Sequence, residues 1–209
     1  MPTDFCKASI LESLPWVEHG FGTRYAAPAP AGFATLKQVH SNLVLVADRG
    51  GPSGEGDALI TNHPGVAVSI RTADCYPILL ADGRNRVVAA IHAGWRGTAA
   101  HIVEKTLDKM KTTFGTSPAD VHAAIGPGIG VCCYEVGEDV ARYFGYAGRT
   151  HLDLASENRK QLEGWGVPGK NVEALGVCTF CDAERFFSYR REKEKAGRMT
   201  SFVRVVMPR

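Results

Sequence analysis

The sequence has little net charge, no long apolar run and no repeated or low-complexity segment. Its 209 residues carry 24 basic and 22 acidic side chains, so the charge excess of a nucleic-acid-binding protein is missing. No apolar run approaches the roughly 18 residues of a transmembrane helix. No basic segment precedes an apolar one near the N-terminus, as it would in a signal peptide. We therefore expect neither nucleic acid nor membrane among its partners.

What remains is the composition of an ordinary globular protein. Hydrophobic residues make up 44% of the chain, enough for a sizeable core, and we expect a single domain over residues 1–209. Six cysteines without a visible secretory signal favour reduced thiols and a cytoplasmic location. They are Cys6, Cys75, Cys132, Cys133, Cys178 and Cys181.

Strand-like and helix-like segments alternate along the chain without a strict βαβ rhythm. Apolar, β-rich runs predict strands on both sides of residue 40 within 33–47, and at 65–70, 86–91, 121–126, 172–177 and 200–206. Helical periodicity predicts helices at 99–114, 138–144 and 153–165. For the first helix we expect Thr98 as the N-cap and Gly115 just after its end. This order is typical of an α/β fold with a mixed sheet.

Three side chains able to bind a metal lie next to strand-like runs. His40, Cys75 and His92 are separated by 35 and 17 residues, unlike the closely spaced ligand pairs of a zinc finger. If they converge, one thiolate and two imidazoles suit zinc or copper, and three ligands leave the open position of a catalytic zinc. Spacing alone does not show convergence, because a single cysteine is commonly a buried small side chain and a single histidine is commonly structural.

A series of short motifs occurs in one order from about residue 18 to the C-terminus. The motifs are HGFGTR (19–24), QVHS (38–41), DALIT (57–61), RTADCYPILLAD (71–82), AAIHAGWRGT (89–98), AAIGPGIG (123–130), YEVGEDV (134–140) and CTFCDAERFFSYRREKEKAGRMTSFV (178–203). Together they resemble the YfiH-like laccase-domain family, whose members are also called multicopper polyphenol oxidases and purine nucleoside phosphorylases. The resemblance implies a single-domain layered α/β sandwich.

The resemblance also implies a metal site and an activity. The zinc ligands of the family fall on His40, Cys75 and His92, so we expect one zinc ion there. The associated chemistry is phosphorolysis of adenosine, inosine and methylthioadenosine, together with adenosine deaminase activity. The expected partners are therefore small purine nucleosides and phosphate. A role in removing aberrant cell-wall precursors is also associated with the family and stays open.

The residues disfavour the oxidase that one of the family names suggests. A laccase needs a blue-copper site and a multicopper cluster built from many histidines. The chain has seven histidines and no H-x-H pair, and five scattered ones remain after His40 and His92 are assigned. Copper is therefore less favoured than zinc as the cofactor, and polyphenol oxidase is the weaker alternative.

Candidates for proton transfer and for anion binding lie inside the same motifs. Asp74 adjoins Cys75 and is the nearest carboxylate for general acid/base work, although it could equally cap a turn. An acid/base is needed because zinc activates water for attack on C6 of a purine. Phosphate is best held by arginines. The candidates are Arg24, Arg71, Arg96, Arg190 and Arg191, each of which could instead be an ordinary surface residue.

Two other interpretations of these residues stay open. Cys75 and His92 could act as the nucleophile and base of a hydrolase without any metal. A binding or scaffolding domain is less favoured, because reactive side chains gather at strand ends, where α/β folds commonly carry their chemistry.

The remaining cysteines give weaker signals. Cys178 and Cys181 form a C-x-x-C that could be redox-active or half of a zinc ribbon, although no second such pair is present. The resembled family usually has only the first of these two cysteines, which favours a structural role for Cys181. Cys132 and Cys133 are adjacent, a poor arrangement for chelating one ion. The roles of Cys178 and Cys181 stay open.

Overall fold

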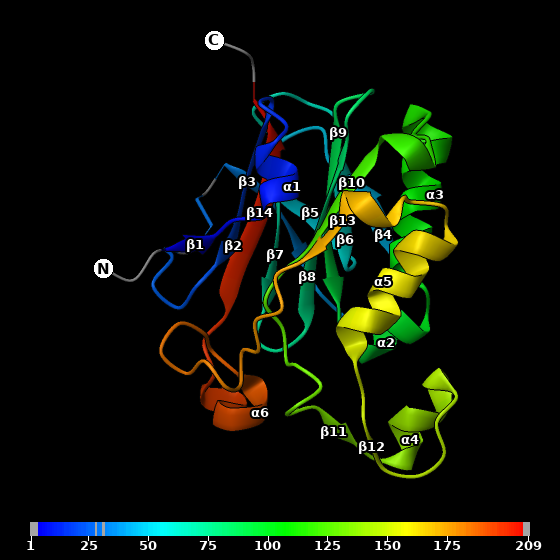
Figure 1. Ribbon diagram of the computed structural model, residues 1–209. Coiled ribbons are helices and arrows are strands. Elements are labelled where there is room, and N and C mark those ends of the chain that lie inside the picture. Colours follow the sequence, from blue (N-terminus) through cyan, green and yellow to red (C-terminus); the bar gives the residue numbers. More distant parts are fainter. Residues whose placement is uncertain (1–3, 28, 31, 207–209) are drawn as a thin grey trace.

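Two β-sheets stacked face to face form the centre of the molecule, and helices cover the outer face of one of them (Figure 1). The structure is a computed structural model that describes residues 4–27, 29–30 and 32–206. Both sheets contain parallel and antiparallel strand pairs. The mixed α/β class expected from the sequence is therefore confirmed.

Each large sheet has six strands within the described residues. The first sheet has the order β1-β2-β14-β7-β3-β5, with the bounds Phe5–Cys6, Val17–Gly22, Met199–Val205, Ala67–Thr72, Phe33–Lys37 and Gly51–Glu55. The second has the order β13-β10-β8-β9-β6-β4, with the bounds Val172–Ala174, Val121–Ile125, Tyr76–Asp82, Val87–Ala93, Ala58–Thr61 and Val44–Val46. A small antiparallel pair is formed by β11 (Glu135–Val136) and β12 (Thr150–His151).

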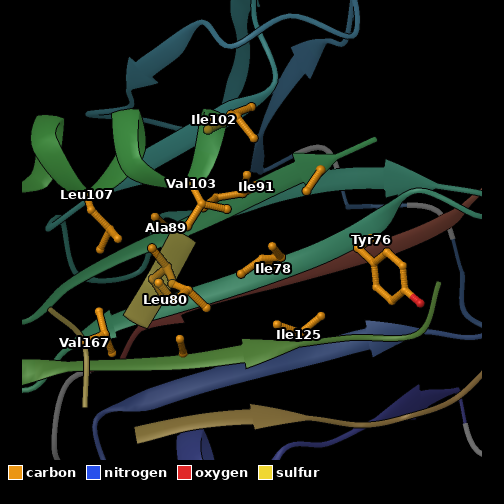
Figure 2. Packing of buried hydrophobic residues seen from close by; sticks show 14 of the residues in the cluster. Tyr76, Ile78, Leu80, Ala89, Ile91, Ile102, Val103, Leu107, Ile125 and Val167 are labelled. Atoms are coloured by element: carbon orange, nitrogen blue, oxygen red, sulfur yellow. The ribbon is translucent and has the colours of Figure 1, made fainter. Parts of the chain in front are cut away.

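The second sheet is buried on both faces, because its strands send alternate side chains into two cores. Ile78 and Leu80 of β8 belong to the core under the helices, and Figure 2 shows them beside Ile91 of β9. Leu79 and Ala81 of β8 belong to the core between the two sheets. Burial on both faces explains why these strands are continuous apolar runs. Each fully buried Leu or Ile contributes about 1.5–3 kcal/mol to folding.

Two longer helices cover this sheet, and shorter helical segments lie in the connections. The longer ones are α3 (Ile102–Phe114) and α5 (Leu154–Gly164). The α-helical turns are α1 (Ser9–Glu12), α2 (Trp95–Ala99), α4 (Glu138–Ala141) and α6 (Tyr189–Glu192). Within the described residues, every helix is too short or too polar to cross a bilayer.

The helix expected at 99–114 begins differently from the prediction. Gly115 ends α3 in the left-handed region at φ 75°, as expected for a residue after a helix. Thr98 is not the N-cap, because α2 already begins at Trp95 and the chain breaks at His101, with φ 59°, before α3. Thr98 is buried inside α2, and its hydroxyl donates to Asn158 Oδ1 of α5 at 3.2 Å.

Strand direction brings several chain crossings to one edge of the molecule. β3 runs parallel to both of its neighbours, β5 and β7, so all three end at the same edge. After each of them the chain crosses to the second sheet, at residues 38–43, 56–57 and 73–75. β9 and β10 end at this edge, and β14 begins there, because they run antiparallel to β8 and β7. We call this edge the crossover rim.

Candidate metal centre

The crossover rim brings together the three ligand candidates that lie far apart in the sequence. His40 lies on the crossing from β3 to β4, Cys75 on the crossing from β7 to β8, and His92 near the end of β9. Their nitrogen and sulfur atoms all lie within 4.8 Å of one another. The two imidazole rings meet edge to face, with centroids 4.9 Å apart at an angle of 77°. We call these residues the ligand triad.

A buried carboxylate that the sequence did not single out holds two members of this triad. Asp57 has no exposed surface, and its Oδ1 lies 2.8 Å from Nδ1 of His92. It also accepts hydrogen bonds from the backbone N–H groups of Val39, His40 and Ser41, at 3.3, 3.1 and 2.6 Å. An ionised carboxylate only accepts, so Nδ1 of His92 carries the proton and Nε2 is left for a ligand.

The backbone around the triad is strained or closely packed. His40 has φ 58° and Asp74 has φ 87°, both in the left-handed region that costs a non-glycine residue free energy. Gly94 follows His92 and Ala93, and a Cβ there would lie 2.8 Å from Cys75 Sγ. Only glycine therefore lets the backbone pass this close to the sulfur.

The triad is electrostatically prepared to present a thiolate. Burial alone would raise the pKa of Cys75, but hydrogen bonds to His40 and His92 outweigh it and lower the pKa to about 6. Burial would lower the pKa of His92, but Asp57 and Cys75 raise it to about 9. Burial would raise the pKa of Asp57, but His92 and Ser41 lower it to about 2.

This donor set fits zinc. Zn–N and Zn–S bonds of about 2.0–2.3 Å in a tetrahedron place neighbouring ligand atoms about 3.3–3.8 Å apart, within the spread of the triad. A carboxylate that accepts from the second ring nitrogen of a ligating histidine, as Asp57 does from His92, is common in zinc sites. Gly94 leaves the sulfur of Cys75 free of contact with a neighbouring Cβ. Three ligands leave a fourth position free for a substrate group.

A pocket of about 680 Å³ opens over the triad. Its cationic lining consists of Lys37, Arg71, Arg96, Arg190, Lys193 and Arg198, and Asp74 is the one carboxylate among its described lining residues. Trp95, Ile129, Tyr134 and Tyr189 supply apolar and aromatic surface. The volume lies within the range of small-molecule sites, and the charge favours an anionic ligand.

The predicted arginines separate into two groups. Arg71, Arg96 and Arg190 line the pocket. Arg24 does not, because its guanidinium donates to the carbonyl of Ala183 at 2.6 Å and lies over the ring of Phe187. Arg24 is therefore not placed to bind an anion in this pocket.

Arg191 also lies outside the pocket lining. Its guanidinium donates to the carbonyls of Thr179, Phe180 and Phe186 at 2.7–2.9 Å, so it holds the surrounding loop together. Its part in the molecule is structural.

Arg96 and Arg190 differ in how free their guanidinium groups are. The guanidinium of Arg96 is exposed and lies 4.3 Å from the ring of Trp95. That of Arg190 already donates twice to the carbonyl of Glu135, at 3.0 Å each. Arg96 is therefore the better placed of the two to hold an incoming anion.

Asp74 lines the pocket, but its carboxylate is committed to the protein. Oδ1 accepts from the Thr179 hydroxyl at 2.7 Å, and Oδ2 accepts from the Ser188 hydroxyl at 3.1 Å and the Arg190 N–H at 2.6 Å. These bonds fasten the segment from residue 179 to residue 190 against the crossover rim. This geometry favours the alternative that Asp74 caps a turn over the expected role as a general acid or base.

One more pocket residue was missed from the sequence. Thr72 lines the pocket, and its hydroxyl is buried with no hydrogen-bond partner among the described residues. A buried hydroxyl without a partner costs about 1–3 kcal/mol, which a polar ligand atom would recover. Thr72 is part of the motif RTADC at residues 71–75, and its place in that motif was the only signal in the sequence.

Comparison with known proteins agrees with this architecture. The family described as multi-copper polyphenol oxidoreductase laccase matches residues 22–206, and the chain belongs to this enzyme family. The resemblance found in the sequence is thereby confirmed. A relative from Deinococcus radiodurans, named purine nucleoside phosphorylase, is 47% identical over 182 residues, which cover 82% of this chain and 69% of that protein.

Two further proteins extend the comparison. The protein named adenosine deaminase RL5, from an unknown prokaryotic organism, is 36% identical over 156 residues, or 70% of this chain and 59% of that protein. The crystal structure of YlmD from Geobacillus stearothermophilus matches with a TM-score of 0.88 at 25% identity, over 99% of this chain and 100% of that one. The layered fold is therefore shared with a solved structure.

Proposed function

We propose that the chain is a zinc-dependent purine nucleoside phosphorylase that also deaminates adenosine. The observation that carries the proposal is the cation-lined pocket directly over the ligand triad. The names of the two relatives support both activities. Adenosine, inosine and methylthioadenosine are the proposed nucleosides, and the six free cysteines fit a reducing cytoplasm.

The pocket offers separate surfaces for the parts of such a substrate pair. The exposed guanidinium of Arg96, with Arg71 beside the triad, provides charge for the phosphate oxygens. The ring of Tyr189, which is 44% exposed, and the ring of Trp95 provide stacking surface for a purine. The buried hydroxyl of Thr72 is available for a polar group of the nucleoside.

The ligand triad would hold the zinc. Zinc bound there supplies a Lewis acid with one open coordination position beside the pocket. Asp57 keeps the proton of His92 on Nδ1, so that Nε2 faces the metal position. In this arrangement Asp74 is a positioning residue, since it keeps Arg190 and the following loop at the pocket wall.

A second candidate function rests on a different use of the same contacts. Cys75, His92 and Asp57 form a thiol–imidazole–carboxylate chain of the kind that cysteine hydrolases use. Such an enzyme would act as an amidase, on cell-wall precursors for example, without metal. Zinc content decides between the two, because a metal-free active protein trapped at Cys75 by a thiol-directed acyl reagent would favour the hydrolase.

The oxidase suggested by the family name has less support from the residues. The described part of the chain contains two clusters of potential metal ligands, one with two histidines and one with none. A multicopper cluster rich in histidine therefore has no counterpart among these residues.

The deciding experiment combines metal analysis with a chromatographic assay of adenosine, with and without phosphate. Adenine and ribose 1-phosphate would report phosphorolysis, and inosine would report deamination. We expect His92→Ala to lower both zinc content and turnover, because it removes a ligand. Unchanged zinc and full activity in this variant would contradict the assignment of the triad.

A further inference from the structure

Four cysteines from two distant segments meet beside the pocket. Cys132 and Cys133 follow β10, and Cys178 and Cys181 follow β13, yet their four sulfur atoms all lie within 4.8 Å of one another. The Sγ atom of Cys181 lies 3.7 Å from that of Cys132 and 3.3 Å from that of Cys133. From the sequence, the roles of Cys178 and Cys181 stayed open and the adjacency of Cys132 and Cys133 disfavoured a shared ion, yet the fold brings all four together. We call these residues the cysteine cluster.

Backbone pairing explains why the two segments meet. Residues 128 and 178 form a parallel β-bridge, and the N–H of Thr179 donates to the carbonyl of Gly128 at 3.0 Å. The next turn then folds back, because the N–H groups of Cys133 and Tyr134 both donate to the carbonyl of Gly130. Adjacent cysteines can therefore share one centre, since the partners come from the other segment.

The space and hydrogen bonding around the sulfurs suit a metal-bound thiolate. The N–H of Gly130 donates to Cys178 Sγ at 3.2 Å. A Cβ at Gly130 would lie 3.2 Å from Cys178 Cβ and 3.3 Å from Cys132 Sγ, so a side chain there would crowd two of the sulfur-bearing residues. A backbone N–H that donates to a ligand sulfur orients the thiolate toward the metal.

The sulfur separations match a tetrahedral centre. A Zn–S bond of about 2.3 Å gives sulfur–sulfur distances of about 3.8 Å in a regular ZnS₄ tetrahedron. Two of the separations, 3.3 and 3.7 Å, are close to this value, and all lie within 4.8 Å. They are well above the roughly 2.05 Å of a disulfide, and all four thiols are free.

We propose that the cysteine cluster binds a second zinc ion, with a purely structural role. Four thiolates close the coordination shell, so no position is left for substrate. Soft sulfur ligands select zinc over magnesium, calcium or manganese. This site is separate from the ligand triad, and it does not depend on the proposed nucleoside chemistry.

The position of the cluster shows what this zinc would stabilise. The segment after β10 places Ile129 and Tyr134 in the pocket wall. The segment after β13 places the hydroxyl of Thr179 on Asp74. A metal joining the two segments would therefore fix one side of the pocket without contacting the substrate.

Zinc counting on the full-length protein tests the proposal. We expect two zinc ions per chain, one for each ligand cluster. The double variant Cys132→Ser/Cys181→Ser should retain one, and the matched control Cys6→Ser, at a half-buried free thiol outside the cluster, should retain two. His92→Ala should also retain one zinc ion, bound by the cysteines, so that each site loses its zinc independently of the other. An unchanged zinc content in the double variant would overturn the proposal.

Thiol reactivity of the native wild-type protein gives a second test that needs no variant. Cys132 and Cys181 are exposed, so as free thiols they would be accessible to an alkylating reagent. We expect protection of both before chelation and labelling of both afterwards, read by peptide mass spectrometry. Rapid labelling before chelation, or a disulfide between cluster members in freshly reduced protein, would overturn the proposal.

Discussion

Replacing Asp57 by asparagine tests how far the buried carboxylate organises the centre. Asparagine keeps the shape of the side chain but removes its charge, and its NH₂ group would face donors instead of accepting from them. In the native protein the carboxylate accepts from His92, from three consecutive backbone N–H groups and from the Ser41 hydroxyl at 2.7 Å. The substitution therefore loosens two of the three metal ligands at once.

The size of the effect follows from burial and from the shifted pKa. The pKa of Asp57 falls from 3.8 to about 2 in the folded protein, which corresponds to about 2 kcal/mol of stability at neutral pH. Breaking a buried charge pair costs about 3–5 kcal/mol, so we expect a loss of about 2–5 kcal/mol. Loss of the carboxylate that orients a histidine ligand lowers metal affinity about 10–100-fold.

The assays are urea unfolding and competition for zinc against a chromophoric chelator. Asp82→Asn is the matched control, because Asp82 is equally buried and accepts three hydrogen bonds at 2.9 Å from residues 84 and 85, at the opposite end of β8. We expect both variants to lose stability and Asp57→Asn alone to lose zinc affinity at the ligand triad. Wild-type zinc affinity in Asp57→Asn would refute the organising role.

Three further predictions concern other sites. Gly94→Ala should lower zinc affinity at least about tenfold, because its Cβ would lie 2.8 Å from Cys75 Sγ. The control Gly164→Ala has open space around the new Cβ and should keep its zinc affinity. Equal affinities in the two variants would contradict this prediction. Thr72→Val should raise KM about tenfold or more with an unchanged or higher melting temperature, since the lost hydroxyl has no partner in the protein; an unchanged KM would remove Thr72 from the substrate site. Burial lowers the pKa of His19 from 6.5 to about 4, so its contribution, about 3 kcal/mol, is present above pH 6.5 and lost as the pH falls to 4. Unfolding free energies across that window should depend less on pH in His19→Gln than in the exposed-site control His63→Gln, and identical slopes would contradict the prediction.

Periodicity and motif order predicted much of the fold. The strand expected at 86–91 is β9, and the helix expected at 153–165 is α5, because apolar periodicity records which face is buried. The strand expected at 65–70 lies two residues later, at Ala67–Thr72. β2 and β8 were not predicted. In β2, Gly20 and Gly22 weaken the strand pattern, and the role of Gly22 in admitting the backbone of Thr200 appears only in the folded chain.

The metal site was predictable from the residues whose side chains are themselves characteristic metal ligands. The members of the ligand triad are distinctive side chains in distinctive motifs, and the fold brings them together. Asp57 carried no such signal, since an aspartate before a strand is commonly a turn residue. The cysteine cluster was missed for another reason: its geometry depends on a β-bridge between segments about 50 residues apart, which sequence spacing does not encode.

The crossover rim has a mechanical consequence. His40 and Cys75 lie where the chain passes between the sheets, whereas His92 belongs to the second sheet alone. Packed sheets stand about 10 Å apart, so the residues between them set how closely the two crossings approach His92. Val68 and Leu79 belong to the buried core between the sheets, so we expect their packing to affect the distances among the three ligands. A metal ion bound by the three residues would link the two crossings to the second sheet. We therefore expect the ligand geometry and the packing between the sheets to change together.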